Sequence, residues 1–224
     1  MAHTTVLLQE SIDGLDIHEG DVFVDCTING GGHSEEVAKR FGKKVKIVGI
    51  DMDANALLKA KDRLTKQNAD FVLSQNNFRN IDKVLQEAGL KQAYRILYDL
   101  GLSSNQFDES GRGFSFQKDE SLLMTFKANP EKDDLTAQEI VNTWDEENIA
   151  DILYGYGGET FSRAIAKAIV EARKTAPILK TSDLVEIIRT ATPGFYHHRK
   201  IHFATKTFQA LRITTNDEIR ALEQ

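Results

Sequence analysis

The residues with the clearest chemical potential are three consecutive glycines, Gly30, Gly31 and Gly32, which follow a short apolar stretch ending in Asp25. Consecutive glycines let the backbone adopt positive φ and pass close to a bound ligand. Helical spacing from Ser34 onward places a helix N-terminus, with free N–H groups and the positive end of its dipole, directly after the glycines. This pattern predicts a ligand-binding turn, and a tight structural turn is the alternative.

A carboxylate, Asp51, ends a second apolar stretch about 20 residues beyond the glycines. A residue in this position can accept hydrogen bonds from both ribose hydroxyls of NAD or of S-adenosylmethionine. The glycines form one block and do not follow the spacing G-x-G-x-x-G, which disfavours a nicotinamide-dependent dehydrogenase. Capping of the next helix is the alternative role for Asp51, although Asp53 could take that role instead. The two segments together predict an S-adenosylmethionine site.

Two further segments follow predicted strands. Asn76, Asn77 and Phe78 could offer amide groups to the edge of an adenine and a ring to stack on it, unless the ring folds back onto the core. Asp99 ends the fourth predicted strand, where a methyl acceptor would lie. A carboxylate that accepts N–H groups from an exocyclic amine favours a pyramidal nitrogen in line with the methyl carbon, and alignment supplies much of the rate. Helix capping or a buried structural carboxylate is the alternative for Asp99.

The elements that must position these residues alternate along the first half of the chain. Strands are predicted at residues 21–25, 46–51, 70–74 and 94–99, and helices at 34–41, 54–66 and 81–88. This alternation is typical of parallel βαβ units, whose strand C-termini share one ligand-binding edge. The predicted fold class is therefore α/β and Rossmann-like.

The second half has a different character. Residues 105–132 are predicted to be loop-like, and helices are predicted at residues 136–143, 145–154, 159–174, 182–191 and 205–224. Thr136 with Glu139 indicates a capping box at the first of these helices. The pattern predicts a helical subdomain that follows the fourth strand.

The composition, with 41% hydrophobic and 28% charged residues among 224, is that of a globular protein. No apolar run is long enough to span a bilayer, and the first ten residues do not resemble a signal peptide. The single cysteine, Cys26, excludes an internal disulfide and is interpreted as a small buried side chain rather than a nucleophile. A cytoplasmic location and no membrane partner are expected.

The net charge of −6 hides an uneven distribution. Residues 161–212 carry 10 lysines and arginines against 3 acidic residues. Local basic patches bind phosphates, so this segment predicts an RNA-facing surface, and a solvated helix face is the alternative. The residues expected on this surface are His197, His198, Arg199, Lys200, His202, Lys206 and Arg212. The histidines have no cysteine partner or fixed metal spacing, so no metal site is expected.

Five blocks of sequence resemble the bacterial 16S rRNA cytosine-N4 methyltransferases, the RsmH (MraW) family, in collinear order over essentially the whole chain. They are His3-Thr4-Thr5-Val6-Leu7-Leu8, the glycine turn through His33-Ser34, Asp99-Leu100-Gly101-Leu102-Ser103-Ser104, Gly111-Arg112-Gly113-Phe114-Ser115-Phe116 and Ala204-Thr205-Lys206-Thr207-Phe208-Gln209-Ala210-Leu211-Arg212. The Arg-Gly-Phe-Ser-Phe and Thr-Phe-Gln-Ala-Leu-Arg blocks are the specific ones.

The resemblance implies S-adenosylmethionine-dependent methylation of the exocyclic N4 amine of a cytosine near the ribosomal P site, in 16S rRNA of the small subunit. It implies a Rossmann-like cofactor-binding domain at residues 1–106, a helical insertion that binds rRNA at 107–203 and a return helix at 204–224. No DNA substrate is expected, and the oligomeric state stays open. By matching motifs, the cofactor contacts would be Gly31, Gly32, His33, Asp51, Phe78, Asp99 and Gln106, with Asp99 also the catalytic candidate.

The chain also departs from the family pattern. Leu123 and Thr125 stand where the usual Leu-Asp-Met-Arg-Met segment has its acidic and basic members, Phe203 replaces a proline and Lys206 an arginine. The sequence ends at Gln224, before further strands of the family, so the chain is expected to be C-terminally truncated, to bind cofactor weakly and to methylate rRNA poorly. The alternative function is a truncated or degenerate relative that binds cofactor or RNA without catalysis.

Overall fold

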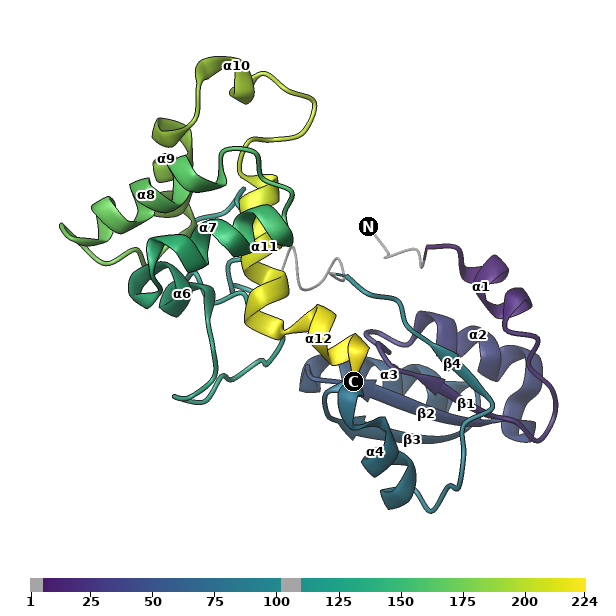
Figure 1. Ribbon diagram of the computed structural model, residues 1–224. Coiled ribbons are helices and arrows are strands. Elements are labelled where there is room, and N and C mark those ends of the chain that lie inside the picture. Colours follow the sequence, from purple (N-terminus) through teal and green to yellow (C-terminus); the bar gives the residue numbers. More distant parts are fainter. Residues whose placement is uncertain (1–5, 102–109) are drawn as a thin grey trace. The chain divides into compact units, whose positions relative to one another are not determined.

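Two compact units make up the chain, and the computed structural model describes residues 6–101 and 110–224 (Figure 1). The sheet unit comprises Met1–Ser103 and Ala221–Gln224, and the helical unit comprises Ser104–Arg220. The domain boundaries expected above, at 1–106, 107–203 and 204–224, remain predictions.

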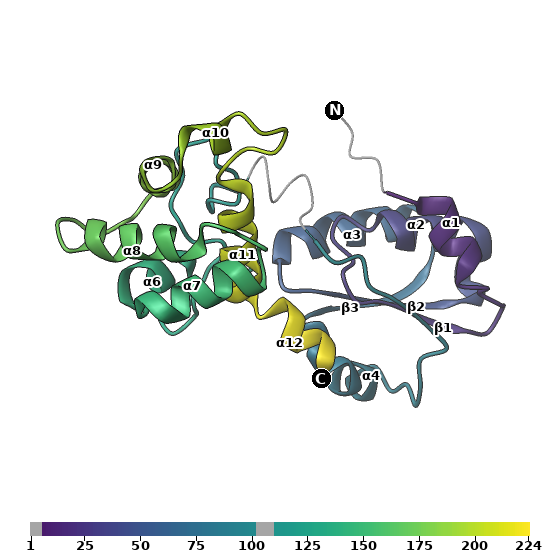
Figure 2. The same cartoon turned by 45° about the horizontal axis from the view of Figure 1, so that its top comes forward.

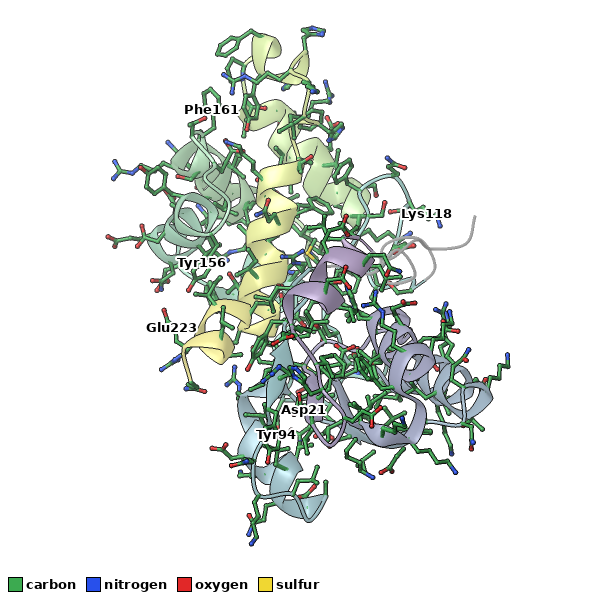
Figure 3. All side chains as sticks on the ribbon, turned by 90° about the vertical axis from the view of Figure 1, so that its right-hand side faces the viewer. Asp21, Tyr94, Lys118, Tyr156, Phe161 and Glu223 are labelled. Carbon is green, nitrogen blue, oxygen red and sulfur yellow. The ribbon has the colours of Figure 1, made fainter. Side chains whose placement is uncertain are left out.

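Four parallel strands form the sheet unit: β1 (Val22–Asp25), β2 (Lys46–Asp51), β3 (Asp70–Gln75) and β4 (Arg95–Leu97), in the order β3-β2-β1-β4. Asp25 lies opposite Gly49 and Leu97, and Asp51 lies opposite Gln75. Parallel pairing brings the carboxyl ends of all four strands to one edge. Asp21 and Tyr94, labelled in Figure 3, precede β1 and β4 at the other edge. The predicted α/β, Rossmann-like class is confirmed.

The fourth strand is shorter than the predicted range 94–99. β4 pairs only with β1, and the last residue of β1, Asp25, lies opposite Leu97. One further bond follows, from the N–H of Cys26 to the carbonyl of Leu97. Asp99 therefore lies beyond the strand, in the loop that leaves the edge of the sheet, rather than at its last position.

Helices cover both faces of this sheet. They are α1 (Leu8–Gly14), α2 (Gly32–Phe41), the 3-10 turn η1 (Gly42–Lys44), α3 (Ala54–Lys66), the 3-10 turn η2 (Phe78–Asn80) and α4 (Ile81–Glu87). Figure 2 shows α1, α2 and α3 on one side of the strands and α4 on the other. α1 was not predicted from the sequence. Its seven residues bury only Ile12, so the apolar periodicity is too short to identify a helix.

Two apolar clusters hold these layers together. Phe23 and Ile47 point into the cluster beneath α2 and α3, while Val24 and Val48 point into the cluster beneath α4. The alternation follows from the two-residue period of a strand. β1 and β2 are thus buried on both sides, which fixes the position of the residues at their carboxyl ends.

The helical unit contains α6 (Ala137–Thr143), α7 (Glu146–Gly155), α8 (Ser162–Arg173), α9 (Thr181–Ala191), α10 (Gly194–His197) and α11 (Thr205–Asn216), and α12 (Glu218–Glu223) follows. α11 packs against α6 and α7. One half of the predicted capping box is present, since the hydroxyl of Thr136 accepts the N–H of Glu139 at 3.1 Å. The predicted single helix at 205–224 is interrupted at Asp217, which adopts a left-handed φ of 51°.

Among residues 6–101 and 110–224, no helix has the length and hydrophobicity needed to cross a membrane.

Candidate cofactor-binding site

The glycine turn joins β1 to α2 and has the positive φ expected for it. Gly31 is the N-cap of α2 with φ 79°, and its N–H donates to the carbonyl of Ile28 at 2.7 Å. A Cβ atom at this position would lie 3.0 Å from the Cα of Ala60 on α3. Both the left-handed backbone conformation and the close approach of α3 therefore require glycine at position 31. Gly32 is the first residue of α2.

We expect Gly31→Ala to lower the free energy of unfolding of the sheet unit by about 2–3 kcal/mol. The left-handed conformation costs an L-residue about 1–2 kcal/mol, and displacement of α3 adds to that cost. Gly14→Ala is the control, because no atom lies within 4 Å of the Cβ it would add. Urea denaturation of both variants measures the difference, and equal stability of the two would contradict the packing argument.

Asp51 is held in place by two backbone N–H groups. Its Oδ2 accepts from Asn29 at 2.8 Å and its Oδ1 accepts from Asp53 at 2.8 Å. Asp53 caps α3 by accepting the N–H of Asn55 at 2.9 Å, so the alternative role considered for Asp51 is filled by its neighbour. Burial raises the pKa of Asp51 to about 6, which leaves it ionised at neutral pH with lone pairs available for ribose hydroxyls.

Asp25, which the sequence analysis did not select as a site residue, is buried beside the turn. The hydroxyl of Ser34 donates to its Oδ2 at 2.7 Å. Burial raises the pKa of Asp25 to about 7, and the nearby carboxylates of Asp51 and Asp99 act in the same direction. The sequence did contain a signal for Asp25 as a site residue, because Asp25 and Ser34 flank the glycine block.

Asp99 and His33 face each other across the turn. Their Oδ2 and Nδ1 atoms are 4.0 Å apart, with Asp99 half-exposed and His33 buried. The N–H of Asp99 donates to the hydroxyl of Thr27 at 2.7 Å, which ties the loop after β4 to the loop after β1. Burial lowers the pKa of His33, and its Nε2 is buried with no hydrogen-bond partner among the described residues.

The segment after β3 has mainly structural contacts. Asn76 accepts from the N–H of Asn77 and the amide of Asn80, and Asn77 caps η2 by accepting the N–H of Arg79 at 3.0 Å. Phe78 is partly buried against the core cluster of α4 and packs edge-on against Tyr98, with 5.5 Å between ring centroids. The asparagine oxygens thus support the turn, while the ring of Phe78 lies beside the loop that carries Asp99.

Cys26 and Gln106 complete the set of residues considered from the sequence. Cys26 is buried, as predicted, and burial raises the pKa of its thiol to about 12, so the reactive thiolate is disfavoured. Gln106 lies outside the described residues.

The arrangement as a whole brings three carboxylates, Asp25, Asp51 and Asp99, to the carboxyl edge of the sheet around one glycine turn. Their mutual repulsion contributes to the raised pKa of Asp25. A cationic ligand would relieve this repulsion, whereas the pyrophosphate of a dinucleotide would add to it. The electrostatics of the edge therefore favour a ligand that carries positive charge near a ribose.

Some basic residues of the helical unit are exposed, and others are bonded to neighbouring residues. Arg199 and Lys200 are exposed, and the guanidinium of Arg199 lies 4.8 Å from the ring centroid of Tyr196. Lys206 donates to the carbonyl of Gly158, and the Nε of Arg212 lies 2.8 Å from Glu218 Oε1. Arg212 is mostly buried in this ion pair, so it is not part of an exposed basic surface.

The segment that departs from the family pattern is part of the packed interior of the helical unit. Leu122, Met124 and Thr125 are buried. The carbonyl of Leu123 accepts the N–H of Ala137 at 2.9 Å, which joins this segment to the start of α6. The burial of these side chains and the bond to α6 give this segment a structural role.

Comparison with known proteins identifies the family of the chain. The whole chain, residues 1–224, matches the family described as the MraW methylase family. It is 46% identical over 222 residues to Ribosomal RNA small subunit methyltransferase H of Clostridium botulinum (strain Kyoto / Type A2), covering 99% of the chain and 70% of that relative. Proteins of the same name from Brevibacillus brevis and Symbiobacterium thermophilum are 41% and 42% identical, over 99% of the chain and 70% and 69% of the relatives.

Proposed function

The chain belongs to the MraW methylase family, and from this premise we propose that it transfers a methyl group from S-adenosylmethionine to the N4 amine of a cytosine in 16S rRNA near the P site. The observation that carries the proposal is the cluster of Asp25, Asp51 and Asp99 around the glycine turn. The names of the relatives supply the substrate class, ribosomal RNA of the small subunit.

The residues at the edge of the sheet fit the proposed cofactor. Asp51 would accept the ribose hydroxyls, because its two oxygens are oriented by backbone N–H groups and keep free lone pairs. The buried Nε2 of His33 lacks a partner in the described structure, which suits a contact with the polar amino-acid part. Gly31 and Gly32 would line the same part, Phe78 the adenine, and Gln106 remains a predicted contact.

When bound, S-adenosylmethionine supplies an electrophilic methyl group on a sulfonium centre. Asp99 is half-exposed, so its carboxylate is accessible to a substrate amine that approaches the edge of the sheet. We propose that it accepts an N–H of the cytosine amine and holds the nitrogen lone pair in line with the methyl carbon. Its bond to Thr27 fixes the backbone, so this alignment requires little reorganisation.

We expect Asp51→Ala to weaken S-adenosylmethionine binding by about 1–3 kcal/mol, because the ribose hydroxyls lose a charged acceptor. Affinity should also fall as the pH is lowered through 6, since the pKa of Asp51 is about 6 and protonation removes the charge. Isothermal titration calorimetry at pH 5 and 7.5 measures both effects. Asp62→Ala, an exposed carboxylate on α3, is the control. Tight NAD binding without S-adenosylmethionine binding would refute the cofactor assignment.

The helical unit is proposed to engage the rRNA through its exposed basic residues, including Arg199 and Lys200. We retain residues 107–203 as the proposed RNA-binding insertion and the cytoplasm as the proposed location, where small ribosomal subunits would be accessible.

The test is a methyl-transfer assay with radiolabelled S-adenosylmethionine and small ribosomal subunits, followed by nucleoside analysis of the 16S rRNA. N4-methylcytidine is the expected product. Cofactor and RNA binding without any transferred methyl group would instead support the alternative of a non-catalytic relative. Methylation of a different base, or of protein, would refute the substrate assignment.

A further inference from the structure

A pocket of about 450 Å³ lies in the helical unit, where α7 ends and α8 begins. Its lining includes Asp151 and Tyr154 of α7, Phe161 before α8, and the first turn of α8, Ser162, Arg163 and Ala164. Figure 3 labels Phe161 on the helical unit, and its ring packs 4.9 Å from that of Tyr196 on α10. The proposed methyl-transfer site uses none of these residues.

The N-terminus of α8 presents backbone donors to this pocket. α8 has twelve residues, and Phe161 at its N-cap provides no side-chain acceptor. The N–H of Phe161 donates to Glu159 Oε1 and that of Ser162 to the carbonyl of Glu159, whereas those of Arg163 and Ala164 have no partner within the described chain. Free N–H groups and the positive end of the helix dipole favour an anion here.

Two side chains add to these donors. Ser162 is only 6% exposed, and its hydroxyl has no hydrogen-bond partner in the described parts of the chain although the residue lines the pocket. The hydroxyl oxygen itself keeps some contact with solvent, so it can bond to water or to a ligand in the pocket. Arg163 is exposed and forms no ion pair with any described residue, so its guanidinium is available to a phosphate.

The acidic groups near the pocket differ in their roles. Glu159 is fully buried and both of its oxygens are engaged, one with the N–H of Phe161 and the other with the hydroxyl of Tyr196 at 2.6 Å. Asp151 is exposed and lines the pocket itself. An isolated phosphate would be repelled by Asp151, whereas a ligand with both a phosphate and an N–H donor could satisfy Arg163 and Asp151 together.

Tyr154 and Phe161 line the same pocket, and Phe195 packs beside Phe161. Tyr154 is 67% exposed and Phe195 is 64% exposed, and the ring of Phe195 lies 6.3 Å from that of Phe161. Exposed rings beside a cationic group are the combination that binds unpaired nucleotides, because each base can stack while its phosphate is neutralised.

We propose that this pocket binds one nucleotide of a single-stranded RNA segment. The phosphate lies at the N-terminus of α8 with Arg163 and Ser162, the base stacks on Tyr154, and an amino group of the base donates to Asp151. The proposal deepens the function proposed above and rests on it only in taking RNA as the partner. It would provide an RNA contact within the helical unit through residues other than Arg199 and Lys200.

The test uses the isotope-labelled 224-residue chain and a fluorescently labelled oligocytidylate. The amide resonances of Arg163 and Ala164 should shift on titration with the oligonucleotide. Arg163→Ala should weaken binding about tenfold. It should also lower by about one the number of counterions released on binding, which the slope of log affinity against log salt concentration measures. Lys167→Ala, an exposed cation one turn further along α8, should change binding less than twofold. Tyr154→Ala should weaken binding about tenfold, and Tyr156→Ala, exposed but outside the pocket lining, less than twofold.

Calorimetry with S-adenosylmethionine and the methyl-transfer assay on small subunits accompany each variant. Unchanged amide resonances away from the substituted residue show that the helical unit of a variant is folded, and unchanged cofactor affinity shows the same for the sheet unit. If the wild-type chain methylates rRNA but its pocket resonances do not move, the pocket proposal is overturned and the proposed function stands. If the pocket binds oligonucleotide as described but no methyl group is transferred, the pocket proposal stands and the proposed function fails. Equal losses of oligonucleotide affinity for Arg163→Ala and Lys167→Ala would also overturn the pocket proposal. Binding would then depend on the net positive charge of α8 and not on the position of Arg163.

Discussion

Asp99→Ala is expected to lower the rate of methyl transfer by about 100-fold to 1000-fold. The substitution removes the carboxylate proposed to hold the substrate amine in line, and loss of one positioned polar group at a reacting centre has effects of this size. Asp99→Asn retains one acceptor oxygen and should recover part of the lost rate. Single-turnover measurements with saturating cofactor and small subunits separate this effect from any change in binding.

The control for this prediction is Asp70→Ala. Asp70 begins β3 at the opposite edge of the sheet and pairs with Lys46, so its loss should leave the rate within about twofold of wild type. A rate for Asp99→Ala that matches the Asp70→Ala rate would show that Asp99 does not take part in the reaction. Both variants should retain the circular dichroism spectrum of the wild-type chain.

The stability of the sheet unit should decrease as the pH rises from 5 to 8, by about 2–3 kcal/mol from Asp25 alone. Burial in the folded chain raises its pKa from 3.8 to about 7, so the folded carboxyl binds its proton more tightly than the unfolded one. This contribution is fully present below pH 4 and is lost as the pH rises through 7, at about 1.4 kcal/mol for each pH unit. Asp51, with its pKa raised to about 6, acts in the same direction.

Asp25→Asn should remove most of this pH dependence. The amide has a similar shape and its oxygen can still accept the hydroxyl of Ser34. Asp82→Asn, an exposed carboxylate on α4, should retain the wild-type pH profile. Hydrogen exchange of the β1 amides in urea, at pH 5 and pH 8, reports on the sheet unit alone. A pH profile for Asp25→Asn that parallels the wild type would contradict the assignment of the proton to Asp25.

The sequence was sufficient to predict the architecture of the sheet unit. The chain alternates buried strands, such as those ending at Asp25 and Asp51, with amphipathic helices. This alternation predicts parallel βαβ units. Most helices of the second half were likewise predicted, because their apolar periodicity is local information, whereas the four-residue α10 was not predicted. The errors were a missed helix, α1, and the ends of elements, as at Asp217, where a single left-handed residue separates α11 from α12. One residue's conformation has no periodic signal in the sequence.

The sequence also identified Gly31, Asp51 and Asp99 as a candidate site, because residue type and position after a strand are both readable along the chain. Only the tertiary structure decided how these residues interact. The raised pKa values of Asp25 and Asp51 depend on burial between the layers, and the 4.0 Å approach of His33 and Asp99 depends on the pairing of β1 with β4. The pocket at the start of α8 depends on the packing of α7 against α8. Burial and contacts between segments distant in sequence arise only when the chain is folded, so desolvation and charge repulsion could not be read from the order of the residues.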